Sequence, residues 1–193
     1  MEWKEAGQLL DNDMIAYPIP KYSQDISSIT VDDCYVYGVI LGVGNLPNDS
    51  EYGNLVLPKD NRKLFHFVES YFGDKLTAIS YESLGNEKTK ISWSKSLNMP
   101  FRYGDIYQNE GEKYVHHRWL NLPVEKMKFI IKGLLDSKGF LGSEITFDSQ
   151  SYHLIECIRF MCLKMGILTS GFTRDRVGSC LLYTSPSPRD GRE

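Results

Sequence analysis

The stretch FIIKGLLDSKG, residues 129–139, decides the fold of this chain. A weaker copy, YVYGVILGVG, occupies residues 35–44. Aligned on their glycines, the copies match Gly38 with Gly133 and Gly44 with Gly139, each pair 95 positions apart. Both copies have the apolar pattern of a helix, so the sequence indicates an internal repeat.

In each copy a small residue stands four positions after the first glycine. Positions i and i+4 share a helix face, and small residues on one face let two backbones approach closely. The sequence therefore predicts two related halves, joined by two helices. The predicted contact residues are Gly38, Gly42, Gly133 and Ser137.

The composition is that of an ordinary globular protein, with 193 residues, 41% hydrophobic residues and a net charge of −3. The slight acidity does not favour nucleic-acid binding, although a net charge can hide a basic face. The longest apolar run, 34–43, is too short to span a bilayer, and no signal peptide is recognisable. The cysteines form no CxxC pair, so we interpret them as reduced residues of an intracellular protein rather than as metal ligands. They are Cys34, Cys157, Cys162 and Cys180.

In the first half, Thr30 followed by Asp33 predicts the N-cap of a helix that ends at Gly44. Asp60 is expected to cap a second helix, which stops at Gly73. Strands are expected at 54–57, 75–79 and 89–93.

In the second half, Pro123 opens the second glycine helix. A turn at 139–142 leads to a strand at 144–147, and Ser149 is expected to cap a helix that ends at Gly166. The apolar stripe of this helix is Leu154, Ile155, Ile158, Phe160, Met161 and Met165. Leu64 matches Leu154 and Val68 matches Ile158 at a spacing of 90 positions, so both halves repeat the order glycine helix, strand, amphipathic helix.

These patterns predict a mixed α/β (α+β) fold with pseudo-twofold symmetry, its repeats at 30–93 and 94–172. In residues 1–20 we expect short strands, with a turn at 11–13 and a strand at 14–17. The last stretch, CLLYTSPSPRDGRE at 180–193, has no amphipathic period. It resembles translated sequencing-adapter sequence, which would make the chain truncated, and the alternative is a disordered Ser/Pro/Arg tail.

The two glycine helices resemble the paired signature of the LAGLIDADG (DOD-type) homing endonucleases, at 36–44 and 131–139. The lead-in at 120–125 and the Ile-Thr-Phe run at 145–147 also fit this family. The resemblance implies two saddle-shaped antiparallel sheets laid on double-stranded DNA, which is cut with Mg²⁺. Residues 3–18 are similar to the end of an intein's N-terminal splicing block. This similarity implies an endonuclease embedded in an intein, with residues 1–22 as the remnant of the splicing block.

In that family, an acid at the eighth signature position of each helix holds the metal. Here those positions are Val43 and Lys138, and neither side chain can bind a cation. Asp136 lies two residues away, about 200° around the helix, and should face away from the site. The resemblance therefore implies a decayed nuclease without catalytic or metal-binding residues. Two alternatives remain: Glu144, Asp148 or another acid has taken over, or the first copy is misaligned.

The family's sheets contact DNA through basic and polar side chains. Candidates here are Lys75, Lys88, Lys90, Lys95, Arg102, Lys113 and Arg118, interleaved with Tyr81, Trp93, Tyr103, Tyr107 and Tyr114. For each of them a solvated edge above packed aromatics is an equal alternative. His116 and His117 should point to opposite faces of a strand and so not form one metal site, while His66 and His153 are expected on helices.

The implied partners are double-stranded DNA and, in cis, an intein splicing domain and its host protein; the chain should be a monomer. Splicing needs an N-terminal nucleophile and a C-terminal His-Asn pair, and neither is found, so most of the splicing domain is expected outside this chain. Two other functions stay open. One is an active free-standing endonuclease, which needs acids at Val43 and Lys138; the other is a non-catalytic DNA-binding or maturase-like protein with a strongly basic concave face.

Overall fold

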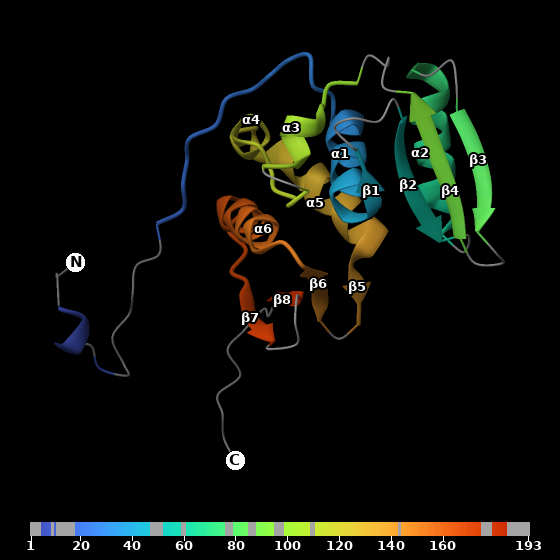
Figure 1. Ribbon diagram of the computed structural model, residues 1–193. Coiled ribbons are helices and arrows are strands. Elements are labelled where there is room, and N and C mark those ends of the chain that lie inside the picture. Colours follow the sequence, from blue (N-terminus) through green and yellow to red (C-terminus); the bar gives the residue numbers. More distant parts are fainter. Residues whose placement is uncertain are drawn as a thin grey trace.

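The computed structural model shows two similar halves that meet along two central helices, α1 and α5 (Figure 1). It describes residues 5–8, 10, 18–46, 52–58, 61–75, 79–84, 88–94, 99–108, 111–142, 144–174 and 179–184. The predicted mixed α/β fold with pseudo-twofold symmetry is confirmed. None of the helices in these ranges has the length and apolar character needed to cross a bilayer.

Each half contains a glycine helix, a four-stranded antiparallel sheet and a helix that covers the sheet (Figure 1). The first half comprises α1 Val31–Val43, β1 Gly44–Asn45, β2 Tyr52–Pro58, α2 Arg62–Lys75, β3 Ile79–Leu84 and β4 Lys88–Ser94. The second comprises α5 Val124–Lys138, β5 Phe140–Leu141, β6 Ile145–Ser149, α6 Tyr152–Lys164, β7 Ser170–Arg174 and β8 Ser179–Thr184. The strand orders β1-β2-β4-β3 and β5-β6-β8-β7 are the same, so the halves share one topology.

The glycine contact between α1 and α5 is the predicted one. A Cβ built on Gly38 would collide with the carbonyl oxygen of Ile130, and a Cβ on Gly133 would collide with that of Tyr35. Ile130 lies 95 positions after Tyr35, so the two collisions are related by the repeat. A Cβ on Gly42 would collide with the Ser137 hydroxyl, which places the two helices side by side in the same direction. The backbones approach closely because none of these positions carries a bulky side chain.

Helix α1 begins and ends at the residues predicted from the sequence. The hydroxyl of Thr30 accepts a hydrogen bond from the backbone N–H of Asp33 at 3.1 Å, and Asp33 accepts one from the N–H of Thr30 at 2.8 Å. This reciprocal capping box fixes the start of the helix at Val31. Gly44 ends it, its N–H donating to the carbonyl of Ile40.

The caps of the two covering helices differ from the prediction. The cap of α2 is Asn61, which accepts from the N–H of Leu64, and Asp60 lies outside the described residues. α6 is capped by Ser151 rather than by Ser149, which is the last residue of β6. Both true caps stand three positions before the first buried leucine of their helix, and they are 90 positions apart.

Several predicted boundaries were wrong. α2 continues past Gly73 to Lys75, because Gly73 keeps a helical backbone, so no strand begins at Lys75 and β3 starts at Ile79. The expected turn at 139–142 contains the short strand β5, which pairs with β6. Phe160, assigned to the buried stripe of α6, is 36% exposed.

At the two ends of the chain the outcome is mixed. Ala6–Gln8 forms a 3₁₀ turn, η1, where short strands were expected; the turn at 11–13 and the strand at 14–17 lie outside the described residues. Residues 180–184, the start of the expected tail, lie in β8, which pairs with β6 and β7. Residues 185–193 lie outside the described part of the chain, and the origin of 180–193 stays a prediction.

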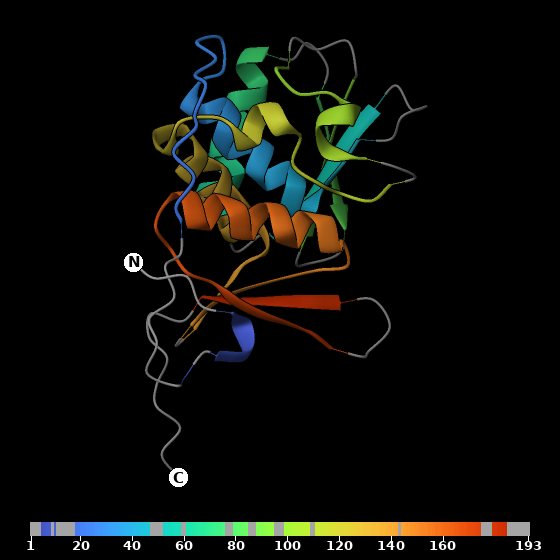
Figure 2. The ribbon, with the colours of Figure 1, turned by 90° about the vertical axis from the view of Figure 1, so that its left-hand side faces the viewer.

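The chain between the halves, residues 99–122, forms two short helices, α3 Tyr103–Ile106 and α4 His117–Leu120. We call these residues the linker. They pack beside α1 on the side of the molecule that also carries α6 (Figures 1 and 2). Trp119 is fully buried and stacks on the ring of Tyr37 at a centroid distance of 4.0 Å, so the linker is part of the core.

Candidate nucleic-acid interface

The C-terminal ends of α1 and α5 lie next to the sheets, because β1 and β5 follow the two helices directly. Two parallel helix ends concentrate partial negative charge and unpaired carbonyl groups. Lys113 of the linker binds the unpaired carbonyl groups at the end of α1. Its ammonium group donates to the carbonyls of Ile40 at 3.1 Å, Leu41 at 3.0 Å and Gly44 at 2.7 Å. One half-buried ammonium group therefore satisfies three carbonyls at the end of α1.

The environment of Lys113 lowers its pKa from the ordinary value to about 8. Burial is the main cause, and the positive charge of Lys138 is the second. Two lysine ammonium groups thus share the region at the ends of the two glycine helices.

The two positions at which the resemblance requires acids carry no oxygen ligand. Val43 is half-buried and packs against the core. Lys138 is exposed, and its Nζ lies 5.7 Å from the centre of the Phe147 ring. An ammonium group repels a divalent cation, so this pair does not fit Mg²⁺.

Asp136 does not compensate for them. Its carboxylate accepts hydrogen bonds from the Tyr35 hydroxyl at 2.7 Å and from the Lys132 ammonium. Its carbonyl accepts one from the side-chain amide of Asn61 at 3.1 Å. As predicted from the helix angle, Asp136 faces α2, away from the helix ends.

The alternative acids are placed no better. Glu144 and Asp148 are exposed, and no third ligand joins them: within the described ranges no three His, Cys, Asp or Glu side chains gather as a metal site would require. The residues present therefore do not fit a Mg²⁺ centre, and no metal-assisted step can be derived from them.

The free face of the first sheet is polar. Along β4, Ile91 and Trp93 are buried against the helices, so Lys88, Lys90 and Ser92 point the other way. The strand register places Asn54 of β2 and Ser80 of β3 on either side of Ser92. Lys90 lies 3.6 Å from Glu82 of β3, an exposed pair that cancels part of the basic charge.

The free face of the second sheet has a different character. Phe147 is buried, so its neighbours Thr146 and Asp148 point outward, and Thr146 pairs with Phe140, which is 69% exposed. Among the side chains described on this face, none is basic. Among the described side chains, the two faces therefore differ in charge.

The predicted DNA-binding residues separate into four groups. Lys88 and Lys90 lie on the free face of the first sheet, and their contact with DNA stays a prediction. Lys113 and Arg118 are engaged inside the protein, and Arg102 is exposed at the start of α3. Lys75 is the last residue of α2, with a side chain outside the described ones, and Lys95 lies outside the described residues altogether.

Two of the five aromatic candidates, Trp93 and Tyr107, pack inside, as the alternative interpretation held. Trp93 is 2% exposed and stacks on Phe72 at 4.6 Å. Tyr107 is buried, stacks on Tyr103 at 4.7 Å, and donates to Asn45 at 3.1 Å. Tyr81 is half exposed, and Tyr114 donates to the carbonyl of Gly104.

The expectation for the adjacent histidines was wrong in geometry. His116 caps α4 and His117 is its first residue, so their rings lie 3.9 Å apart rather than on opposite faces of a strand. His66 and His153 lie on helices as predicted, beside Glu69 and Glu112.

The polar residues that complete the free face of the first sheet, Asn54, Ser80 and Ser92, were not among the candidates. Alternation along 88–94 carries the necessary signal, because Ile91 and Trp93 are apolar and every second residue is polar. The role of Lys113 had no such signal, because it depends on contacts with carbonyls about 70 positions away.

The architecture described above is the LAGLIDADG homing-endonuclease fold. The homing endonuclease I-DmoI in complex with DNA and Mn superposes with a TM-score of 0.57 at 15% identity, covering 80% of this chain and 89% of that one. Mesophilic variants of I-DmoI give 0.58 at 13% identity, covering 81% and 89%. The N-terminal LAGLIDADG domain of DUF199/WhiA gives 0.50 at 13% identity, covering 80% and 76%. No family model and no curated protein sequence matches the chain.

Proposed function

We propose that this protein binds double-stranded DNA with the free faces of its sheets and does not cut it. The observation that carries the proposal is the combination of a homing-endonuclease fold with Val43 and Lys138 at the helix ends. I-DmoI, which has this fold, was solved with DNA and a metal ion. Here the same region holds two ammonium groups, which repel Mg²⁺, and the exposed one, on Lys138, suits phosphate.

The charges of the faces support a weak and salt-sensitive interaction. Lys88 and Lys90 supply phosphate contacts on the first sheet, and the second sheet has Asp148 and Phe140 on its free face. A maturase-like protein with a strongly basic concave face is less well supported, because Glu82 neutralises part of the basic charge. The nuclease of the sequence resemblance would then be decayed, with DNA binding retained.

An intein origin remains part of this proposal. It rests on the sequence of residues 3–18, and an embedded domain would have a splicing domain and a host protein in cis. Sequencing the coding DNA on both sides would test it: splicing junctions would support the intein origin, and an unrelated reading frame would exclude it.

The binding test uses a pool of random-sequence 30-base-pair duplexes and filter binding over a range of KCl concentrations, in EDTA and in Mg²⁺. We expect the same affinity in EDTA as at low Mg²⁺, and no cleavage in either. Lys88→Ala and Lys90→Ala should each reduce the salt slope by about 1. Lys128→Ala removes the same charge from an exposed site in the first turns of α5 and should leave the slope unchanged.

Installing acids tests the loss of cleavage directly. In Val43→Asp combined with Lys138→Glu, we expect Mn²⁺ binding by isothermal titration where the parent shows none. Cleavage by the parent protein in Mg²⁺ would overturn the proposal, and so would the absence of any salt-dependent binding to duplex DNA.

A further inference from the structure

An open cleft of about 460 Å³ lies between α1, α2 and α5. Neither the metal positions nor the basic residues of the first sheet line it. Its lining includes Tyr35, Asn61, Lys63, Phe67, Lys132 and Asp136. None of the segments that the structure describes fills it.

The internal symmetry of the fold assigns this cleft a counterpart on the other side of the molecule. Residues of α1 and α5 correspond at a spacing of 95 positions, and residues of α2 and α6 at a spacing of 90. The counterparts of Lys132 and Asp136 are therefore Tyr37 and Leu41. Those of Asn61, Lys63 and Phe67 are Ser151, His153 and Cys157.

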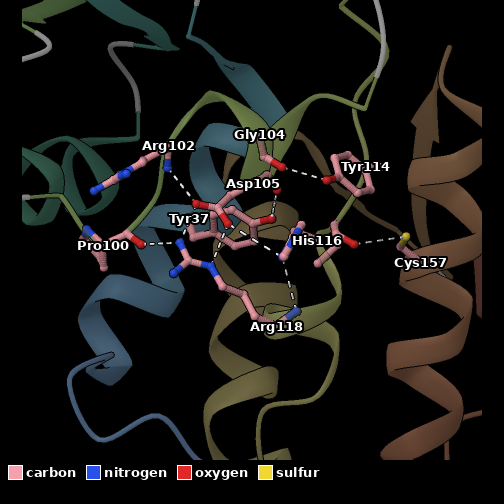
Figure 3. Close-up of polar contacts among 10 residues, drawn as sticks. Tyr37, Pro100, Arg102, Gly104, Asp105, Tyr114, His116, Arg118 and Cys157 are labelled. Atoms are coloured by element: carbon pink, nitrogen blue, oxygen red, sulfur yellow. Dashed lines mark hydrogen bonds and ion pairs between the residues drawn. The ribbon is translucent and has the colours of Figure 1, made fainter.

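The linker fills the counterpart groove. Tyr37 donates to the carbonyl of Asp105 (Figure 3) and stacks on Trp119. The carbonyl of Leu41 accepts from Lys113. From α6, three more residues contact the linker. Ser151 donates to the carbonyl of Lys113, His153 lies 3.9 Å from Glu112, and Cys157 donates to the carbonyl of Val115 at 3.7 Å.

All five residues thus touch the linker in one groove, and all five of their counterparts line the open cleft. The same backbone frame holds a polypeptide segment on one side of the molecule and is open on the other. We infer that the open cleft is a docking site for an extended segment of a partner protein. This inference is independent of the proposed DNA binding.

The side chains of the cleft define the chemistry of the segment. In the filled groove, the lining donates hydrogen bonds to backbone carbonyls and stacks on one large aromatic ring. In the open cleft, Lys63 and Lys132 replace His153 and Tyr37, so the donors are cations, and Asp32 and Asp136 line the cleft beside them. Phe67 and Tyr35, edge to face at 4.7 Å, provide an aromatic wall. The fitting segment therefore carries an aromatic anchor flanked by carboxylates.

The cation at the centre of the cleft is held in place before a partner arrives. Lys132 pairs with Asp136, and its Nζ lies 5.1 Å from the centre of the Tyr35 ring. Because the ion pair is exposed on the lysine side, an incoming carboxylate can join it at little cost. A preformed donor loses less conformational entropy on binding.

A phage-displayed library of random 16-residue peptides, selected on the full chain, tests the inference. We expect enriched peptides to contain an aromatic residue next to Asp or Glu. Synthetic copies, measured by fluorescence anisotropy, should bind at least tenfold more weakly to Lys132→Ala and to Lys63→Ala. Lys128→Ala, an exposed lysine of α5 that does not line the cleft, is the matched control and should bind normally.

Three results would overturn the docking site. The selection could yield no enriched peptide, or peptides whose affinity is the same for the cleft variants and the parent. Alternatively, a 30-base-pair duplex could displace the peptides while Lys63→Ala and Lys132→Ala weaken DNA binding equally, which would make the cleft part of a DNA surface. All the variants change exposed lysines, so circular dichroism of each should match the parent.

Discussion

Gly38 and Gly133 hold the two halves together because each leaves room for a carbonyl group of the opposite helix. No side chain can be accommodated at either position without moving backbone. Gly73, also in a helix, differs in having open space around the position of its Cβ.

We therefore expect opposite effects from the same substitution at these positions. Gly38→Ala should lower the free energy of unfolding by about 3 kcal/mol, because the helices must separate. Gly73→Ala should raise it by about 0.5–1 kcal/mol, because alanine is the better helix former. Urea denaturation of the two variants checks this, and equal effects would contradict the close contact.

The surroundings of Lys113 set the pKa of its side chain. The ammonium group of Lys113 should titrate with a pKa of about 8, which NMR of the side-chain carbon next to the nitrogen can measure. In Lys138→Gln this pKa should rise, because a neighbouring positive charge is removed. An unchanged pKa in that variant would show that the charge of Lys138 does not act on Lys113.

The same shift makes stability depend on pH. The unfolded chain keeps this lysine protonated up to about pH 10.4, whereas the folded protein releases the proton from about pH 8. Between these values unfolding takes up a proton, so the contribution of Lys113 to stability rises with pH and is lowest below pH 8. The free energy of unfolding of the parent, relative to that of Lys113→Met, should therefore rise between pH 7 and pH 10.

At the scale of elements, the linker is held by one buried carboxylate. Asp105 accepts from the backbone N–H of Arg102 at 2.7 Å and forms a bidentate pair with the guanidinium of Arg118 (Figure 3). Arg118 also donates to the carbonyl of Pro100 at 2.6 Å. These bonds fix α3 against α4 and keep Trp119 on Tyr37.

Asp105→Ala should lower the free energy of unfolding by about 3 kcal/mol, because it leaves a partly buried guanidinium without its partner. Glu82→Ala breaks the exposed pair with Lys90 and should cost about 0.5 kcal/mol or less. Thermal unfolding of both variants is the measurement, and a small effect at Asp105 would show that the linker is held by packing alone.

Local signals allowed α1 to be predicted from end to end, because Thr30, Asp33 and Gly44 lie within its own turns. The caps of α2 and α6 were missed, since several polar residues precede each helix and only packing decides among them. The glycine contact could be predicted because two copies carry it. The seating of the linker could not, because it depends on carbonyl groups and rings contributed by distant elements.

At the scale of the whole molecule, α1 and α5 belong to both halves. Buried residues surround α1 on all sides, and they come from the first sheet, the linker and α5. Neither half can lose its glycine helix without exposing the core of the other. We therefore expect the halves to unfold together.

Single-tryptophan variants check this cooperativity. One variant keeps only Trp93, which reports on the first half, and the other keeps only Trp119, which reports on the linker. Trp3 is replaced by Phe in both variants. In each variant the fluorescence and far-ultraviolet circular dichroism transitions in urea should coincide. Separate transitions for Trp93 fluorescence and circular dichroism would indicate halves that unfold independently.

The distance along the chain between the two glycine helices also affects synthesis of the protein. α1 leaves the ribosome 95 residues before the helix that must cover it. At translation rates of about 5–20 residues per second, this interval lasts about 5–20 s. During that time the face of α1 that packs against α5 has no native partner, so the newborn chain depends on chaperones more than its modest size would indicate.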